Sequence, residues 1–486
     1  MKKLFPLSLL MLIGLTPQQA WTQLRYVDPL FAEVTVTADL LYGSNISVLT
    51  GSPAQEDLLL DVYAPVGDTA SQRPLVLIAH DGSFLPPPFN QMCTGTRQDS
   101  AVRMLCTLLA QRGYVAAAIS YRLGWNPVST TQDIRTGTYI NALYRGIQDM
   151  RTAVRFFRAD AATTNTYRIH PDQIAVGGLG TGGYLSLGTA YLDSYDEINL
   201  PKFIDFNTNT SYIDTSISGD LEGKNTRPLN LGNYVDYSSD VQFVFHLGGA
   251  VGDSSWIEAD EPSVVSFHVP SDPFFPYDFG AIIVPTTGDF VVNMSGGKGI
   301  QRRAHALGLQ TDLPLTDPYS VAADLINDGL DGLYPFFRPA GLETSPWAYF
   351  DTTCSNASTV LLTNPDMSRD KSERYLDTVV NYLAPRMPFY LGIYDIAASS
   401  LDAQAASAQV KIFPNPAQDH LQLRAETAAD AIEQVAVFDL SGRRVWQMEG
   451  EKRLSLEIDL SALKSGIYLI KIQARSGLKI EKLRLD

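Results

Sequence analysis

The sequence is poor in cysteine, in histidine and, beyond its first residues, in long apolar runs. It has 3 cysteines and 6 histidines among 486 residues, and no cysteines stand in the C-x-x-C spacing that zinc sites use. The net charge is −16 and no basic cluster interrupts it, so we expect neither nucleic acid nor anionic lipid as a partner. No stretch after residue 23 is long and apolar enough to span a bilayer. These absences argue against a zinc finger, a nucleic-acid-binding protein and an integral membrane protein.

The N-terminus has the pattern of a secretory signal. Lys2 and Lys3 precede an apolar run over residues 4–15, and a polar stretch then ends at the small residue Ala20. This order is typical of an exported precursor, so the sequence predicts a signal peptide at residues 1–23. The alternative is a buried N-terminal helix.

Export would permit disulfide bonds. Cys93 and Cys106 are the nearest pair in sequence, so the sequence predicts that they pair. The odd count means that at least one thiol, here Cys354, stays free or finds another partner.

Residues 24–395 alternate short apolar runs with longer helical patterns, which predicts one domain built on a mostly parallel sheet with helices on both faces. Continuous apolar runs such as LVLIA favour strands that are buried on both sides. The polar residues 194–240 interrupt the alternation, and we expect them to form an insertion or a functional cover. The expected strands are 58–63, 75–80, 114–121, 174–178, 241–246, 264–268 and 332–337, and the expected helices are 101–112, 138–159, 183–192, 298–309 and 369–383.

A second, smaller domain is expected at the C-terminus. Residues 396–409 are dominated by Ala, Ser, Gln and Asp, which is typical of a linker. Residues 410–486 follow with turn residues between short apolar segments, the pattern of an Ig-like β-sandwich. Seven strands are expected, at 410–413, 420–423, 434–439, 444–448, 454–458, 467–473 and 479–484.

Three motifs of this tail, in order, are FPNPAQDHLQL from Phe413, VAVFDLSGRRV from Val435 and LSALKSGIYLIKI from Leu460. Together they resemble the type A sorting domain of the type IX secretion system. The resemblance implies that residues 410–486 engage that secretion machinery, and that the protein crosses the outer membrane and is attached to the surface or released. The alternative is a carbohydrate-binding or adhesive sandwich.

Three motifs of the body resemble secreted esterase and lipase-like α/β hydrolases over about residues 55–385. The segment IAVGGLGTGGYLSL from Ile174 is similar to the strand–turn–helix that carries a nucleophilic serine. LVLIAHDGSF from Leu75 is similar to the His-Gly-Gly-Gly loop, which implies an oxyanion loop at Asp81, Gly82 and Ser83. VVSFHVPSDPFFPY from Val264 is similar to the strand and loop of the triad acid, which implies that role for Asp272.

Two of the three triad members are missing from these motifs. The gapless match puts Gly180 at the nucleophile position, and glycine has no side chain to attack a carbonyl. No histidine occurs between His305 and His420, where the triad histidine is expected. His305 itself falls in a helical pattern beside two arginines, so we interpret it as part of a solvated helix face.

The leading hypothesis is therefore an exported protein that keeps the hydrolase fold, lacks triad chemistry and cofactors, and binds a small-molecule or glycan-like ligand. The ligand pocket is expected to be lined by His80, His246, His268 and Trp347, beneath the cover at 194–240. One alternative is an active carboxyl-ester hydrolase that uses Thr181, whose backbone N–H is otherwise expected in the oxyanion hole. The other is a metal-assisted hydrolase, because the strands of the three pocket histidines and of Asp272 would end at one edge of the sheet.

Overall fold

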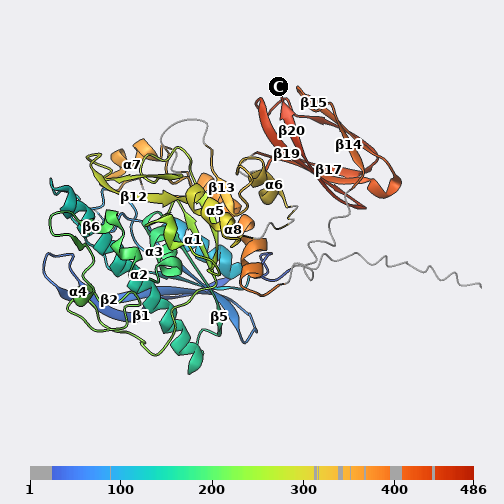
Figure 1. Cartoon of the computed structure of the whole chain (residues 1–486). Coiled ribbons are helices and arrows are strands. Elements are labelled where there is room, and N and C mark those ends of the chain that lie inside the picture. Colours follow the sequence, from blue (N-terminus) through green and yellow to red (C-terminus); the bar gives the residue numbers. More distant parts are fainter. Residues whose placement is uncertain are drawn as a thin grey trace, which may run out of the picture.

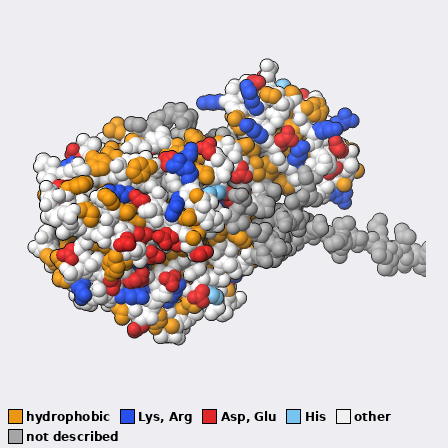
Figure 2. All heavy atoms as spheres, in the orientation of Figure 1, with side chains coloured by type: hydrophobic (Ala, Val, Ile, Leu, Met, Phe, Trp, Pro, Cys, Tyr) orange, Lys and Arg blue, Asp and Glu red, His pale blue; other side chains and the backbone are white. Residues whose placement is uncertain are grey.

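The computed structural model describes residues 24–486 except 88, 311, 312, 314, 316, 338–342, 351, 366, 367, 395–407 and 440–443. The expected signal peptide and most of the expected linker therefore lie outside the described residues. Figure 1 shows a larger body of helices around a sheet, and a smaller β-domain made from the C-terminal residues. Figure 2 shows acidic side chains gathered on the visible face of the body, in keeping with the net charge of −16.

An eight-stranded sheet forms the centre of the body. Its strand order is β1-β2-β4-β3-β5-β8-β10-β13. The pairs β1–β2 and β2–β4 are antiparallel, and every later neighbour in this order pairs in parallel, which confirms the expected mostly parallel sheet. The strands are β1 (Val34–Ser47), β2 (Ala54–Pro65), β3 (Arg73–Ala79), β4 (Val115–Ile119), β5 (Ile169–Leu179), β8 (Phe243–Leu247), β10 (Ser263–His268) and β13 (Leu333–Pro335).

Helices cover both faces of this sheet (Figure 1). Strand β3 shows the cause: Leu75 and Leu77 belong to one buried core and Val76 and Ile78 to the other, because side chains alternate along a strand. The first core is covered by α2 (Gln132–Ala162), α3 (Thr181–Tyr191) and α5 (Gly297–Ala306), and the second by α1 (Ser100–Gln111), α6 (Pro318–Asp324) and α8 (Arg369–Tyr390). None of the helices in the described part of the chain is both long and apolar enough to cross a membrane.

The insertion at 194–240 packs along α2. Three arginines of this helix donate to insertion carbonyls: Arg151 to Leu221 at 2.6 Å, Arg155 to Glu222 at 2.7 Å and Arg158 to Ser238 at 2.7 Å. A fourth, Arg122, follows β4, donates to the Leu229 carbonyl at 2.9 Å and forms an ion pair at 2.8 Å with Asp149 of α2. The insertion contains β6 (Ile204–Asp205), β7 (Thr210–Ser211) and α4 (Thr215–Ser218).

A small sheet and a short helix complete the body. Strands β11 (Phe279–Ile283) and β12 (Phe290–Gly296) form a hairpin, and β9 (Ala250–Val251) pairs with β12. The short helix α7 (Ala357–Thr363) lies in the segment between β13 and α8.

The C-terminal domain is a sandwich of two antiparallel sheets. One sheet has the order β14-β15-β18 and the other β17-β16-β19-β20, and their buried side chains form one core. All seven expected strands are present, as β14 (Val410–Phe413), β15 (His420–Ala425), β16 (Ile432–Asp439), β17 (Arg444–Arg453), β18 (Ser455–Asp459), β19 (Gly466–Ala474) and β20 (Gly477–Leu485).

The predicted disulfide is wrong. Cys93 pairs with Cys354, 261 residues later in the chain, and Cys106 is a free, buried thiol. Cys106 lies in α1 and packs into the core between that helix and the sheet, so it cannot turn toward the loop that holds Cys93. The prediction relied on proximity in sequence. It failed because the fold brings the segment after β13 next to the loop that holds Cys93.

The ion pair between Arg122 and Asp149 should be a main anchor of the insertion. Both side chains are fully buried, so Asp149→Ala would leave an uncompensated buried guanidinium. We expect this substitution to lower the free energy of unfolding by about 3–5 kcal/mol, measured by urea denaturation. Removing the exposed Arg369–Glu373 pair by Arg369→Ala is the control and should have almost no effect. Equal effects of the two substitutions would contradict this role for Arg122.

Candidate functional site

Gly180 lies at the sharp turn between β5 and α3, here called the elbow. Its backbone has φ +51° and ψ −119°, a conformation that residues with a side chain rarely adopt. The turn is held by hydrogen bonds from Gly180 N to the Leu247 carbonyl at 2.8 Å and from Gly183 N to the Gly180 carbonyl at 2.9 Å. The segment thus has the strand–turn–helix form expected from the sequence, with no side chain at its apex.

The carboxyl group of Asp81 occupies the space beside this apex. A Cβ atom built on Gly180 would lie less than 3.0 Å from the carboxyl carbon of Asp81 and from both of its oxygens, closer than real Cβ atoms approach. Any side chain at position 180 would therefore overlap the Asp81 carboxylate. The absence of a side chain at 180 and the presence of one at 81 are sterically linked.

The donors expected in the oxyanion hole are already used by Asp81. Its Oδ1 accepts hydrogen bonds from Gly82 N at 2.7 Å, from Thr181 N at 3.0 Å and from Thr181 Oγ1 at 3.1 Å. Burial raises the pKa of Asp81, and the hydrogen bonds from Thr181 and Gly82 oppose this shift. A substrate oxygen would have to compete with this resident carboxylate for the same N–H groups.

The loop that carries Asp81 is fixed in a strained conformation. Gly82 has φ +139°, and a Cβ atom on it would lie 2.9 Å from the Cα of Gly95. Ser83 has φ +54°, and its carbonyl accepts a hydrogen bond from Trp125 Nε1 at 2.7 Å. These contacts hold Asp81 in place relative to the elbow, and residues strained in this way cluster at functional sites.

Asp272 lies in the loop after β10. Its Oδ1 accepts hydrogen bonds from Phe274 N at 2.8 Å and Phe275 N at 3.0 Å, while Oδ2 is buried and has no hydrogen-bond partner. Burial raises the pKa of Asp272 to about 7, and the nearby charge of Asp81 adds to the shift. In the part of the chain that the structure describes, no histidine is hydrogen-bonded to this carboxyl group.

The histidines of the body have separate partners. His246 shares a hydrogen bond with Ser266 Oγ at 2.8 Å, and His268 Nε2 contacts the Phe275 carbonyl at 3.2 Å. His80 stacks on Tyr121 with ring centroids 4.5 Å apart, and His305 contacts the Asp331 carbonyl at 2.8 Å. Burial lowers the pKa of His80 and of His268 to about 4, so both are neutral at pH 7.

These contacts do not support a metal centre. Among the residues that the structure describes, no three or more His, Cys, Asp or Glu side chains are arranged to hold a metal ion. His80 and Asp81 adjoin the elbow, and His246 Nδ1 accepts a hydrogen bond from Gly249 N at 3.0 Å. The metal-assisted alternative therefore has no geometric basis in these residues.

A cavity of about 30 Å³ adjoins Asp81, which is room for only a few water molecules. Of the expected pocket residues, Trp347 lines the cavity together with Asp81 of the expected oxyanion loop, and His80 precedes Asp81 in the chain. Two features of it were missed in the sequence: Asp99, whose pKa burial raises to about 6, and the roof formed by residues after β13. The cavity is lined by Asp81, Met92, Thr94, Asp99, Ala101, Leu179, Ser345, Trp347, Ala348, Tyr349, Phe350, Val360 and Asn364.

The filling of the elbow by Asp81 was also missed, although the sequence held a signal for it. The serine position and the loop position after His80 both depart from their motifs, one by losing a side chain and the other by gaining one. Considered together, these two differences from the motifs would have suggested that the side chain at 81 fills the space left empty at 180. The expected cover at 194–240 lies along α2, and the residues that close over Asp81 come from 345–364.

Comparison with known proteins identifies both domains. Residues 411–485 match the family model of the secretion system C-terminal sorting domain, and residues 60–222 match the esterase-like family model named BD-FAE. A stretch of 137 residues is 29% identical to a non-reducing polyketide synthase of Stereocaulon alpinum, covering 28% of this chain and 5% of the synthase. The chain thus spans a small part of that relative.

Solved structures of esterase 2 from Thermogutta terrifontis are similar to this chain. The enzyme phosphoramylated by tabun has a TM-score of 0.41 and 15% identity, with 75% of this chain and 96% of that chain covered. The native enzyme has a TM-score of 0.39 and 15% identity, with 78% and 99% covered.

The sorting-domain match confirms the expected export. It favours a sorting domain over the alternative of a carbohydrate-binding or adhesive sandwich. It also implies an interaction of the tail with the secretion machinery. The sheet order and the BD-FAE match confirm the α/β-hydrolase fold of the body. The chain is therefore an exported protein with an esterase-like α/β-hydrolase body followed by a C-terminal sorting domain of the type IX secretion system.

Proposed function

We propose that the body of this exported protein has lost serine-esterase chemistry and acts by binding a ligand beside Asp81. The observation that carries the proposal is the Asp81 carboxylate, which fills the space of a nucleophile at Gly180 and takes up the N–H groups of Thr181 and Gly82. Acyl transfer needs a nucleophile, a base that a carboxylate orients, and free donors for the oxyanion. In this protein the Asp81 side chain fills the space of the nucleophile and occupies the donors for the oxyanion.

The ligand that we propose is a small molecule or a glycan. The cavity lining combines the aromatic residues Trp347, Tyr349 and Phe350 with the amide of Asn364 and the hydroxyl of Ser345. Apolar and aromatic walls with a few polar groups are typical of small-molecule sites. Asp81 and Asp99 add two acceptors that suit ligand hydroxyl groups.

One contact favours an alternative in which Thr181 is the nucleophile. Its hydroxyl donates to Asp81 Oδ1 at 3.1 Å, so Asp81 would take the proton as Thr181 attacks. However, Thr181 is only 1% exposed, and its own N–H is bound to the same carboxylate. A carbonyl carbon would have to reach a buried oxygen in a hole that is already filled.

A covalent probe separates these two functions. We expect a fluorophosphonate to leave Thr181 unlabelled in intact-mass and peptide analysis of the full chain, because the hydroxyl is buried and the hole is filled. We also expect hydrolysis of p-nitrophenyl acetate to be the same for the protein and its Thr181→Val variant. Stoichiometric labelling of Thr181, or loss of ester hydrolysis in that variant, would establish the esterase and end the binding proposal.

Ligand binding beside Asp81, the second part of the proposal, is tested separately. Saturation-transfer NMR with a panel of neutral mono- and disaccharides, run before and after reduction of the Cys93–Cys354 disulfide next to the cavity, should show contacts in at least one of the two states. These contacts should disappear in Trp347→Ala and persist in Trp446→Ala, which changes the sorting domain. Contacts that survive the loss of Trp347 would place binding elsewhere.

The steric link between Gly180 and Asp81 predicts non-additive stability changes. Gly180→Ser should cost at least about 2 kcal/mol because the new side chain overlaps the Asp81 carboxyl group and sits at positive φ. Adding Asp81→Gly should recover about 1–3 kcal/mol of this cost, measured as the coupling energy in urea denaturation. Gly51→Ser is the matched control, since Gly51 also has positive φ but no atom within 4 Å of a Cβ, and should show no coupling to Asp81→Gly. Additive effects at Gly180 and Asp81 would show that the two sites are independent.

The raised pKa of Asp272 predicts a pH-dependent cost. In the unfolded chain this group ionises near pH 4, and in the folded protein near 7, so stability should fall as the pH rises from about 4 to 7. Asp272→Asn keeps an oxygen for Phe274 N and Phe275 N but has no proton to lose. The variant should therefore be more stable than the wild type by at least about 1 kcal/mol at pH 8, and the difference should shrink toward pH 4.

Urea denaturation at pH 4.5, 6 and 8 measures this difference, with Asp172→Asn on an exposed strand residue as the control. A variant that is less stable at pH 8 would mean that the ionised carboxylate has a partner, as a working triad would require.

A further inference from the structure

Residues 343–350 and 352–365, here called the cap loop, form a compact loop with its two ends side by side. Thr344 N donates to the Thr363 carbonyl at 3.1 Å, and Ser345 N donates to Asn364 Oδ1 at 3.2 Å. Helix α7 lies between these ends, in the second half of the loop. The cap loop is therefore a closed unit with a base and a tip.

The base of the cap loop is fixed to helix α8. Lys371 of α8 forms a buried ion pair with Glu343 at 2.6 Å, and Ser372 Oγ donates to the Trp347 carbonyl at 2.5 Å. Trp347 also packs on Phe336, with ring centroids 6.2 Å apart. These contacts do not depend on the disulfide.

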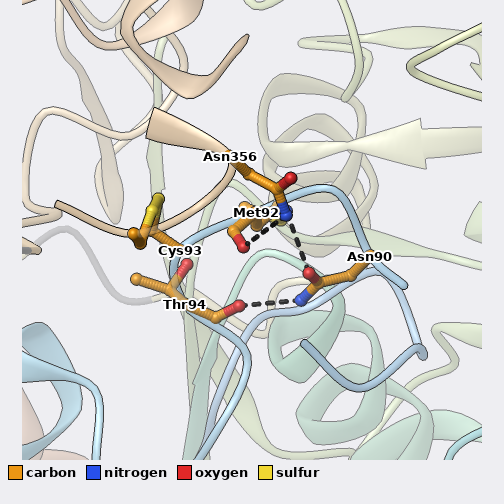
Figure 3. Close-up of a disulfide and its surroundings, with 6 residues drawn as sticks. Asn90, Met92, Cys93, Thr94 and Asn356 are labelled. Carbon is orange, nitrogen blue, oxygen red and sulfur yellow. Dashed lines mark hydrogen bonds between the residues drawn. A yellow bond between two sulfur atoms is a disulfide. The ribbon is translucent and has the colours of Figure 1, made fainter. Parts of the chain in front are cut away.

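The tip of the cap loop is fixed to the loop that follows the oxyanion loop, and the Cys93–Cys354 disulfide is the covalent part of this contact (Figure 3). Asn356 Nδ2 adds a hydrogen bond to the Met92 carbonyl at 3.3 Å. Phe350 and Val360 form a small apolar cluster with both cysteines, separate from the main cores of the body. Without the disulfide, only non-covalent contacts would hold the tip, this hydrogen bond and this small cluster among them.

The two segments joined by the disulfide line the cavity at Asp81 from opposite sides. Met92 and Thr94 line it from one side, and Ser345, Trp347, Phe350 and other cap-loop residues line it from the other. The gap left between them is about 30 Å³, too small for a sugar or a comparable ligand. Binding at Asp81 therefore requires the cap loop to move away from the Met92 side.

We propose that the Cys93–Cys354 disulfide is a redox latch that closes the cap loop over the Asp81 cavity. Reduction by a dithiol transfers two electrons and two protons to the disulfide, giving two cysteine thiols while the dithiol becomes a disulfide. The tip then separates from Met92, while the buried Glu343–Lys371 pair keeps the base in place as a hinge. This regulation rests on the proposed function, because it controls access to the same ligand site.

Hydroxyl-radical footprinting tests the latch without any ligand, so its result is independent of what the site binds. Trp347, in the first half of the cap loop, lines the cavity and is 2% exposed, and Trp256 is 4% exposed in a different part of the body, which makes Trp256 an internal control. In the Cys93→Ser/Cys354→Ser variant, oxidation of Trp347 should rise about tenfold and that of Trp256 should stay unchanged, because only a local segment opens. Cys106→Ser, which leaves the disulfide intact, should match the wild type at both residues.

If the double variant does not fold, the folded wild type reduced with dithiothreitol gives the same comparison. Unchanged oxidation of Trp347 after loss of the disulfide would overturn the latch. An equal rise at Trp347 and Trp256 would also overturn it, because the disulfide would then stabilise the whole body instead of closing one site.

Discussion

The carboxylate of Asp81, placed against the bare backbone of Gly180, is the contact on which the character of this site depends. The elbow keeps the backbone form of a nucleophile turn, with φ +51° at Gly180, but the space above it is taken by a side chain from a different strand end. The N–H groups of Thr181 and Gly82 then have an internal anion to bind. The glycine at 180 and the aspartate at 81 depend on each other, because a side chain at 180 would overlap the Asp81 carboxyl group.

Three acidic groups with raised pKa values lie at or near this site. Burial raises the pKa of Asp81, Asp99 and Asp272, and the charge of Asp81 raises the other two further. Groups whose pKa values are shifted in this way often mark functional sites, because a structural core would avoid their cost. The fold supplies a rigid frame for them, and the function follows from the site and not from the fold.

The sequence was sufficient for the parts of the structure that depend on local pattern. Runs such as LVLIA predicted buried parallel strands, and the turn residues of the tail predicted all seven strands of the sandwich. The position of Gly180 at the elbow followed from a gapless motif. The predictions that failed depended on contacts between distant segments: Cys93 finds Cys354 because the segment after β13 folds back onto the loop near residue 93. The same kind of contact explains why the filling of the elbow by Asp81 was not foreseen, since residues 81 and 180 are brought together only by the pairing of β3 with β5.

The central claim is that the Asp81 carboxylate, and not a ligand or a water molecule, occupies the hole at the elbow. A crystal structure of the full chain at a resolution that separates individual carboxyl oxygens measures this directly. We expect density for Asp81 Oδ1 within about 3 Å of both Thr181 N and Gly82 N, with no space for a side chain at Gly180. Density that shows Asp81 turned away, with a water molecule or an anion bound between those two N–H groups, would contradict the account.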